Sequence, residues 1–191
     1  MSLQVWLTLG RVSNLPTVWS NVLAALALAG ALSAEPRVLA LAAAFSVFYV
    51  GGMYLNDAFD RHIDARERPT RPIPSGRAGA TAVFAIGFGA LALGTLLVAL
   101  VARASGASVA RGATSGAVLA GIIVVYDVYH KKNPISPLIM GACRVMIYVA
   151  AGYAVSEHLP APLLCGAAAL WCHLIGLTYA AKQEAFNRLT R

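Results

Sequence analysis

Charged residues are scarce in this chain of 191 residues, because only 12% are Asp, Glu, Lys or Arg while 59% are apolar. An ordinary soluble domain carries about a quarter of its residues as charged ones. A large soluble all-α core would also need amphipathic helices with one polar face, and the long apolar segments have hardly any such face. The composition therefore argues against an ordinary soluble domain and indicates that lipid surrounds the protein.

Cysteine is also rare. Cys143, Cys165 and Cys172 all fall inside apolar segments and lack the C-x-x-C spacing of metal sites, so we expect packing residues rather than a disulfide framework or a zinc site.

The first apolar run is too long for a cleaved signal peptide and has only Arg11 in front of it. We expect it to stay in the membrane.

Long apolar runs are abundant, and most approach the roughly 20 residues that a membrane-spanning helix needs. We expect an all-α integral membrane protein, folded as a single domain over residues 1–191 and built as a bundle of about six transmembrane helices. Small residues such as Gly87, Gly89 and Gly94 would allow these helices to approach closely. The expected spans cover approximately residues 15–34, 38–59, 79–102, 108–129, 135–156 and 159–181.

Lysine and arginine are divided unevenly between the two sides of this expected bundle. Of the fifteen, alternate connections place eleven on one side and three on the other, with Arg144 inside a span. By the positive-inside rule the richer side, with both termini and the polar segment at residues 56–77, is cytoplasmic; we expect a bacterial inner membrane. Topology accounts for the net charge of +7, so no nucleic-acid partner is expected.

The polar segment 56–77 reads NDAFDRHIDARERPTRPIPSGR. If the second helix continues for about two turns into it, Asp57, Asp60 and Asp64 lie on one face at i, i+3 and i+7. Asn56 adds an amide oxygen close by. Mg²⁺ would relieve the repulsion between these carboxylates, since it prefers oxygen ligands and commonly binds one or two carboxylates together with substrate phosphates. The spacing predicts a site for a magnesium diphosphate.

Basic residues follow these acids. Arginine carries a fork of donors that matches phosphate oxygens. For each arginine taken singly, a solvated helix end is the favoured interpretation, whereas a topology signal does not require the ordered acids. The arginines of this segment are Arg61, Arg66, Arg68, Arg71 and Arg77.

Residues 56–64 and 68–77 resemble the first aspartate-rich motif, NDxxDxxxD, and the following RP-I-P-x-G loop of the UbiA superfamily of intramembrane prenyltransferases. The similarity covers most of the chain, and its later stretches are most similar to the EboC-like branch. The further matching stretches are R11-V-S-N14, Y126-D127 with Lys131, G141-A-C-R144 and G176-L-T-Y179-A-A-K182-Q-E184.

The resemblance implies a helical bundle whose central cavity opens to the cytoplasm and to lipid. It implies an enzyme that uses Mg²⁺ to transfer an isoprenoid group from a polyprenyl diphosphate to an apolar or aromatic acceptor. The catalytic residues would be Asp57, Asp60 and Asp64. The metal ligands would be Asn56, Asp57, Asp60, Asp64 and Glu184, and the substrate-binding residues Asn14, Asn56, Arg68, Arg71, Tyr126, Lys131 and Arg144.

Arg144 lies in the middle of the fifth expected span, where a charge costs at least about 2.5 kcal/mol and usually faces the protein interior. It either lines the substrate cavity or pairs with Asp127 to hold two helices together. His130 and His62 are expected to be interfacial polar residues, because no paired His/carboxylate zinc spacing surrounds them. The family often has Tyr-x-x-x-Lys at Tyr126, but here His130 takes that spacing and Lys131 follows it.

Two departures from the family pattern leave alternatives open. The family usually carries a second aspartate-rich motif after the sixth helix, whereas this chain offers Glu184 as the one carboxylate there. The family fold is a ring of nine helices, so the chain is a natural short form, a truncated sequence, or part of a homo-oligomer in which another copy completes the cavity. A catalytically silent UbiA-like membrane binding or scaffold protein is therefore the second hypothesis.

Overall fold

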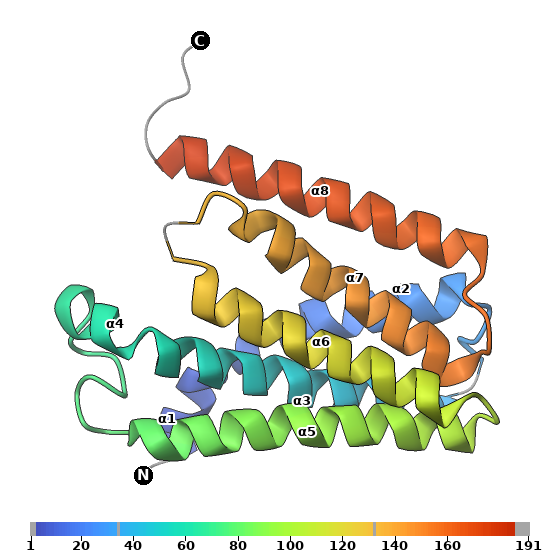
Figure 1. Cartoon of the computed structure of the whole chain (residues 1–191), viewed down its shortest axis with the longest axis horizontal. Coiled ribbons are helices and arrows are strands. Elements are labelled where there is room, and N and C mark those ends of the chain that lie inside the picture. The colour runs from blue at the N-terminus through green and yellow to red at the C-terminus, as the bar shows by residue number, and fades with distance from the viewer. Residues whose placement is uncertain (1–2, 34, 132, 186–191) are drawn as a thin grey trace.

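The computed structural model describes residues 3–33, 35–131 and 133–185, and these residues form helices and connecting turns with no strand. The long helices run side by side along one direction (Figure 1). This confirms the expected all-α bundle. The elements are α1 (Leu3–Leu9), the 3₁₀ turn η1 (Val12–Asn14), α2 (Leu15–Leu28), α3 (Glu35–Phe59), α4 (Arg61–Glu67), α5 (Ala80–Ala104), α6 (Val109–Tyr129), α7 (Ser136–Val155) and α8 (Ala161–Ala185).

Among the described residues, five helices are long and apolar enough to cross a membrane, namely α3, α5, α6, α7 and α8. They correspond to the second through sixth expected spans. The first expected span differs, because α2 has only 14 residues. Its length of about 21 Å falls short of the roughly 30 Å of a bilayer's hydrocarbon core.

The early end of α2 has a local cause. Gly30 adopts a left-handed conformation with φ of 71°. The N–H of Gly30 donates to the carbonyl of Ala27 at 3.0 Å, and the N–H of Ala31 donates to that of Leu26 at 2.9 Å. This bond pattern is a Schellman motif, which ends a helix after Leu28 even though the sequence stays apolar. The expected span 15–34 is therefore wrong at its C-terminal end.

Close contact between α3 and α5 depends on missing side chains. A Cβ atom added to Gly87 would lie 2.8 Å from the side chain of Leu55, and one added to Gly94 would lie 2.7 Å from the ring of Phe48. Both distances are too short for carbon atoms to coexist. Gly89, by contrast, has nothing within 4 Å of that position. Gly87 and Gly94 thus serve the close packing expected of them, whereas Gly89 does not.

The helices pack in a sequence across the bundle. α5 packs against α3 and α6, α6 packs against α7, and α7 packs against α2 and α8. α8 lies along one edge in Figure 1, and only 11% of its apolar window is buried, compared with 44% for α3. Cys165 and Cys172 on α8 are exposed, so the expectation that they are packing residues is wrong for these two.

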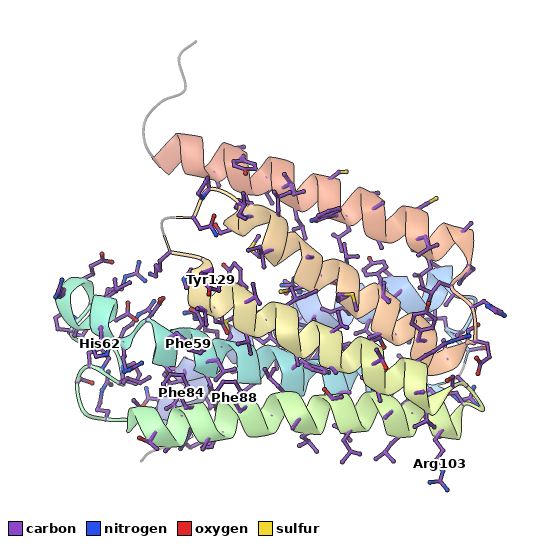
Figure 2. All side chains as sticks on the ribbon, in the orientation of Figure 1. Phe59, His62, Phe84, Phe88, Arg103 and Tyr129 are labelled. Carbon is purple, nitrogen blue, oxygen red and sulfur yellow. The ribbon has the colours of Figure 1, made fainter. Side chains whose placement is uncertain are left out.

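The two ends of the bundle differ in their connections. α4, the link between α6 and α7, and the C-terminal end of α8 lie at one end (Figure 1). His62 and Tyr129 mark this end, and Arg103 marks the other (Figure 2). α1 packs near the first end, since Val5 and Leu9 form a cluster with Tyr54, Ala58 and Val83. The basic residues around segment 56–77 therefore gather at one end, while its cytoplasmic orientation stays a prediction.

Candidate active site

Four buried polar residues lie where α3 passes into α4. The exposed fractions of Asn56, Asp57, Asp60 and Asp64 are 6%, 7%, 4% and 1%. α3 ends at Phe59, yet the N–H of Asp60 still donates to the carbonyl of Asn56 at 3.0 Å and that of Asp64 donates to Asp60 at 2.9 Å. The expected continuation of the helix is thus present as α4, after a break at Asp60.

Arg71 joins two of these acids. Its Nη1 donates to Oδ2 of Asp64 at 2.7 Å and to Oδ1 of Asp57 at 3.1 Å. Arg71 reaches them because the Pro-rich connection after α4 folds into turns, in which the N–H of Ser75 donates to the carbonyl of Arg71 at 3.0 Å. Proline restricts φ and favours such turns. The RPIPSG loop therefore places a guanidinium on the aspartate segment.

Arg11 approaches the same acids from the other side. It lies between α1 and η1 in the left-handed region, with φ of 44° and ψ of 44°. Its Nη2 donates to Oδ1 of Asp57 at 2.9 Å and to Oδ1 of Asn56 at 3.4 Å. A residue with a side chain costs about 1–2 kcal/mol in this conformation and keeps it only where its surroundings require it. The sequence analysis did not select Arg11, although it opens the R-x-x-N stretch.

Asp60 belongs to a second group. Its Oδ2 lies 3.2 Å from Nζ of Lys131 and 3.4 Å from Nε2 of His130, both just after α6. His130 was expected to be an interfacial residue, and the structure instead places it against this acid. The three carboxylates therefore do not all face one point: Asp57 and Asp64 share Arg71, and Asp60 turns toward the end of α6.

Asp127 on α6 extends the network inward. Nδ2 of Asn56 donates to Oδ1 of Asp127 at 3.1 Å, and only 3% of Asp127 is exposed. Within the described part of the chain, Oδ1 of Asp64 and Oδ2 of Asp127 are buried and have no hydrogen-bond partner. Most buried polar atoms in proteins are paired. The two oxygens are therefore buried acceptors whose hydrogen-bonding capacity is unused among the described residues.

A polar pocket of about 220 Å³ is lined by Arg11, Met53, Asn56, Asp60, Arg68, Arg71, Tyr126, His130 and Lys131. An apolar cavity of about 280 Å³ lies next to it, and Arg11, Met53 and Tyr126 line both. α2, α3, α6 and α7 supply the rest of the apolar wall, which includes Val18, Phe45, Phe48, Tyr49, Leu119, Ile123 and Ile147. The charged pocket at the end of the bundle thus continues into an apolar cavity within it.

Most of the predicted substrate-binding residues meet at these two spaces. Asn56, Arg68, Arg71, Tyr126 and Lys131 line the polar pocket, and Arg144 lines the apolar cavity. Asn14 is exposed and is absent from both linings among the described residues. The side chain of Glu184 lies outside the described residues. The roles assigned to all of these residues stay predictions.

Arg144 has an unusual set of contacts. Its Nη2 donates to Oγ1 of Thr17 at 3.4 Å, while its Nη1 is buried without a hydrogen-bond partner among the described residues. The ion pairs found in residues 3–33, 35–131 and 133–185 do not include Arg144 with Asp127. The structure therefore gives no support to the interpretation that this pair holds two helices together.

The donor types around segment 56–64 suit a hard divalent cation. They are carboxylate and amide oxygens, and the buried Oδ1 of Asp64 has no hydrogen-bond partner among the described residues. Within the described part of the chain, however, no three His, Cys, Asp or Glu side chains converge on one point. Mg²⁺ commonly binds one or two carboxylates and completes its shell with water and substrate phosphates. The residues fit such a site better than a cage built by the protein alone.

Comparison with known proteins identifies the family. The model of the UbiA prenyltransferase family matches residues 14–188. The digeranylgeranylglyceryl phosphate synthase of Ignicoccus hospitalis is 38% identical over 111 residues, which are 58% of this chain and 36% of that protein. The corresponding synthase of Methanopyrus kandleri is 34% identical over 101 residues, which are 53% of this chain and 37% of that protein.

A solved structure of a digeranylgeranylglyceryl phosphate synthase has the same fold. It superimposes with a TM-score of 0.72 at 20% identity, over 91% of this chain and 58% of that one. The matched region thus spans little more than a third of the two sequence relatives and somewhat over half of the solved chain. The expected likeness to the EboC-like branch stays a prediction. From the match over residues 14–188, together with the shared fold, this chain belongs to the UbiA prenyltransferase family.

Proposed function

We propose that this chain is a Mg²⁺-dependent intramembrane prenyltransferase that moves an isoprenoid group from a polyprenyl diphosphate to an apolar or aromatic acceptor. The observation that carries the proposal is the continuity of the polar pocket with the apolar cavity through Arg11, Met53 and Tyr126. A polyprenyl diphosphate has the matching shape, since a strongly anionic head is joined to an apolar chain. The prenyltransferase family and the synthase relatives support the same reaction class.

The head group would lie in the polar pocket. Arg11, Arg68, Arg71 and Lys131 line that space, and arginine and lysine form strong charge-assisted hydrogen bonds with phosphate oxygens. Arg11 and Arg71 are paired with carboxylates, so a bound diphosphate would share these cations. The same donors would then stabilise the negative charge that grows on the diphosphate as it leaves.

Mg²⁺, when bound, would neutralise the diphosphate and stabilise the charge on its leaving oxygen. Asp57, Asp60 and Asp64, with the amide oxygen of Asn56, are the residues that we propose to hold it. The buried Oδ1 of Asp64, which has no hydrogen-bond partner among the described residues, supports this assignment. Glu184 is kept as a proposed further ligand on the evidence of the sequence alone.

The apolar cavity would hold the start of the isoprenoid chain. Phe45, Phe48, Leu119, Ile123 and Ile147 supply its wall. In the proposed transfer, the allylic C–O bond breaks and the diphosphate leaves with its electron pair. A bond from the acceptor to the allylic carbon forms, and the acceptor gives up a proton. An apolar wall excludes the water that would otherwise react with the allylic cation.

The cellular setting is part of the proposal. Arg11, Lys131 and the arginines of segment 56–77 share one end of the bundle, which supports a cytoplasmic position for the diphosphate pocket and for both termini. A bacterial inner membrane and a homo-oligomer stay predictions.

A catalytically silent UbiA-like membrane binding or scaffold protein is the second candidate. The specific observation in its favour is that Arg11 and Arg71 already neutralise Asp57 and Asp64. Such an arrangement can hold the ends of helices together without any substrate. The two candidates differ in turnover, because only the enzyme converts a polyprenyl diphosphate and an acceptor to a prenylated product and diphosphate.

The first test is the binding of geranylgeranyl diphosphate to the purified full chain in detergent, with and without Mg²⁺. The wild type is compared with Asp60→Ala and with Glu67→Gln, a control that removes an exposed acid from the end of α4. We expect tight binding only with Mg²⁺, its loss in Asp60→Ala and its retention in Glu67→Gln. Binding that is independent of both metal and Asp60 would remove the proposed site.

The second test is release of diphosphate from bound geranylgeranyl diphosphate in the presence of candidate acceptors. Turnover by the wild type, and none by Asp60→Ala, supports the enzyme. Metal-dependent binding without release of diphosphate with any acceptor supports the binding or scaffold protein instead.

A further inference from the structure

A groove runs between α6 and α7, which lie side by side in the bundle (Figure 1). Its volume is about 400 Å³. It is separate from the two spaces of the candidate active site, because no residue that lines it lines either of them. α6 supplies Arg111, Thr114 and Val118 to its wall, and α7 supplies Met146, Val149 and Tyr153.

Polar and apolar residues are separated along this groove. Arg111 lies two residues after the start of α6, and Tyr153 lies two residues before the end of α7. Val118 and Met146 each lie nine residues from the same helix ends. At a rise of about 1.5 Å per residue these positions are roughly 3 Å and 14 Å deep, and one leaflet of the hydrocarbon core is about 15 Å deep. The polar groups therefore lie at the level of lipid head groups, and the apolar ones at the level of acyl chains.

The polar end of the groove carries both signs of charge. Nη1 of Arg111 lies 2.9 Å from Oε2 of Glu157, and the two side chains are 46% and 49% exposed. Within the described part of the chain, the hydrogen bonds of this guanidinium use Nη1 alone, and those of the carboxylate use Oε2 alone. Nε and Nη2 of Arg111 thus remain as donors, and Oε1 of Glu157 remains as an acceptor.

We propose that this groove binds a phospholipid whose head group carries a phosphate and a primary ammonium, as in phosphatidylethanolamine. Arg111 donates from Nε and Nη2 to the phosphate oxygens, and the ammonium donates to Oε1 of Glu157. One acyl chain lies against Val118, Met146 and Val149. The site is independent of the proposed prenyl transfer, since it shares no lining residue with the candidate active site.

Charge complementarity distinguishes this head group from others. Charge-assisted hydrogen bonds are stronger than neutral ones, and the zwitterion forms them with both members of the exposed pair. An anionic head group without an ammonium would satisfy Arg111 but would be repelled by Glu157. A choline head group has a positive charge but no N–H to donate. Both should therefore bind more weakly than phosphatidylethanolamine.

The acyl chain has room beyond the end of this groove. Val118 also lines a second groove of about 500 Å³ between the same helices. Its wall is apolar and includes Ile122 and Val125 from α6 and Ile139 and Ala142 from α7. The two grooves together form an apolar path along α6 and α7 that begins at the charged pair.

The test is native mass spectrometry of the purified full chain in detergent, titrated with palmitoyl-oleoyl phosphatidylethanolamine, phosphatidylcholine or phosphatidylglycerol. The head-group variants are Arg111→Gln and Glu157→Gln. Both should fold, because an exposed ion pair contributes little to stability. Arg103→Gln is the matched control, since Arg103 is an exposed arginine at the same end of the bundle (Figure 2).

A second pair of variants tests the acyl-chain part of the groove. Val118→Trp adds a ring that fills the groove. Val128→Trp is its control, because Val128 lies on the same helix, outside both grooves. Val118 and Val128 are each 44% exposed, so the two substitutions differ in their position relative to the groove rather than in burial.

We expect the wild type to bind phosphatidylethanolamine with a Kd about tenfold lower than that of the other two lipids, the effect of roughly one charge-assisted hydrogen bond. Arg111→Gln and Val118→Trp should each raise this Kd about tenfold, whereas the two controls leave it unchanged. Glu157→Gln should remove the preference, so that phosphatidylglycerol binds as well as phosphatidylethanolamine.

Three results would overturn the lipid site. Equal binding of the three lipids by the wild type would mean that lipid contacts this face without recognition. A phosphatidylethanolamine Kd that is the same in Arg111→Gln and Arg103→Gln would remove the head-group contact. A dimer mass that disappears in Val118→Trp but persists in Val128→Trp would show that a second copy of the chain covers the groove instead.

Discussion

The two ends of the bundle handle charge in different ways. At the end with α4, Arg71 bridges Asp57 and Asp64, whose side chains are 9% and 1% exposed. At the opposite end, Arg111 on α6 pairs with Glu157 after α7, with side chains 46% and 49% exposed. The first end brings charged groups from distant parts of the chain into a buried network, and the second joins the first turn of α6 to the connection after α7 at the surface.

This difference is informative because exposed and buried ion pairs contribute differently to the free energy of unfolding. An exposed pair contributes about 0–1 kcal/mol, since water already solvates both charges. A buried pair adds little net stability compared with an apolar pair, but removing one partner leaves a buried charge and costs about 3–5 kcal/mol. Stability alone does not require the buried network. The buried network agrees with a role in binding an anionic ligand.

Arg71→Met should have the largest effect. The substitution leaves Asp57 and Asp64 buried without the guanidinium that they share, so we expect the free energy of unfolding to fall by about 3 kcal/mol or more. Arg103→Met, an exposed arginine at the opposite end, should change it by less than about 0.5 kcal/mol. Unfolding in mixed detergent micelles measures both. Equal losses in the two variants would contradict the contrast between the ends.

Gly94→Ala should have the next largest effect, in the middle of the bundle. The new Cβ would lie 2.7 Å from the ring of Phe48, and forcing extra volume into a packed contact costs about 1–3 kcal/mol. Gly89→Ala is the matched control, because its Cβ would meet nothing within 4 Å. It should be neutral or stabilise by up to about 1 kcal/mol through helix propensity. Unfolding in mixed detergent micelles measures both variants. Equal changes in the free energy of unfolding would mean that α3 and α5 are not closely packed at Gly94.

Local patterns explain which parts of this structure could be predicted from the sequence. The five long helices follow from apolar length, and helix periodicity predicts that Asp57, Asp60 and Asp64 lie near one another, although their carboxylates do not all face one point. The end of α2 depends on Gly30, whose effect as a helix terminator was available in the sequence but was hidden by the apolar run around it. α1 escaped prediction because its seven residues are too few for a clear pattern.

The missed site residues have a different explanation. Arg11 and His130 join the aspartate segment only through tertiary packing, since they lie 46 and 70 residues from their partners Asp57 and Asp60. Spacing along one helix cannot show such contacts. It also could not show that Asp60 turns toward Lys131 while its two neighbours in the motif share Arg71. Spacing along the chain indicates which charged residues lie near one another, whereas tertiary packing decides which of them pair.

Addition of Mg²⁺ and inorganic pyrophosphate should stabilise the end with α4. A ligand at ten times its Kd adds about 1.4 kcal/mol to the free energy of unfolding if it binds only the folded state. We expect this gain for the wild type and for Glu157→Gln at the opposite end, and its loss in Asp60→Asn. Melting temperatures with and without each ligand give the measurement. A gain that persists in Asp60→Asn would place the binding of the metal and pyrophosphate elsewhere.

The smallest effect should come from the pair at the opposite end. Nη1 of Arg111 lies 2.9 Å from Oε2 of Glu157 and also donates to the Glu157 carbonyl, while the guanidinium stacks 6.0 Å from the Tyr153 ring. A double-mutant cycle with Arg111→Met and Glu157→Gln isolates the side-chain pair, because the carbonyl and the ring are unchanged in both backgrounds. We expect a coupling of about 0.5 kcal/mol that shrinks when salt rises from 0.1 to 1 M, since the Debye length falls from about 10 to 3 Å. A coupling above about 2 kcal/mol that resists salt would show that this pair is shielded from water, and it would remove the difference between the two ends. We expect the smaller coupling because both side chains are exposed.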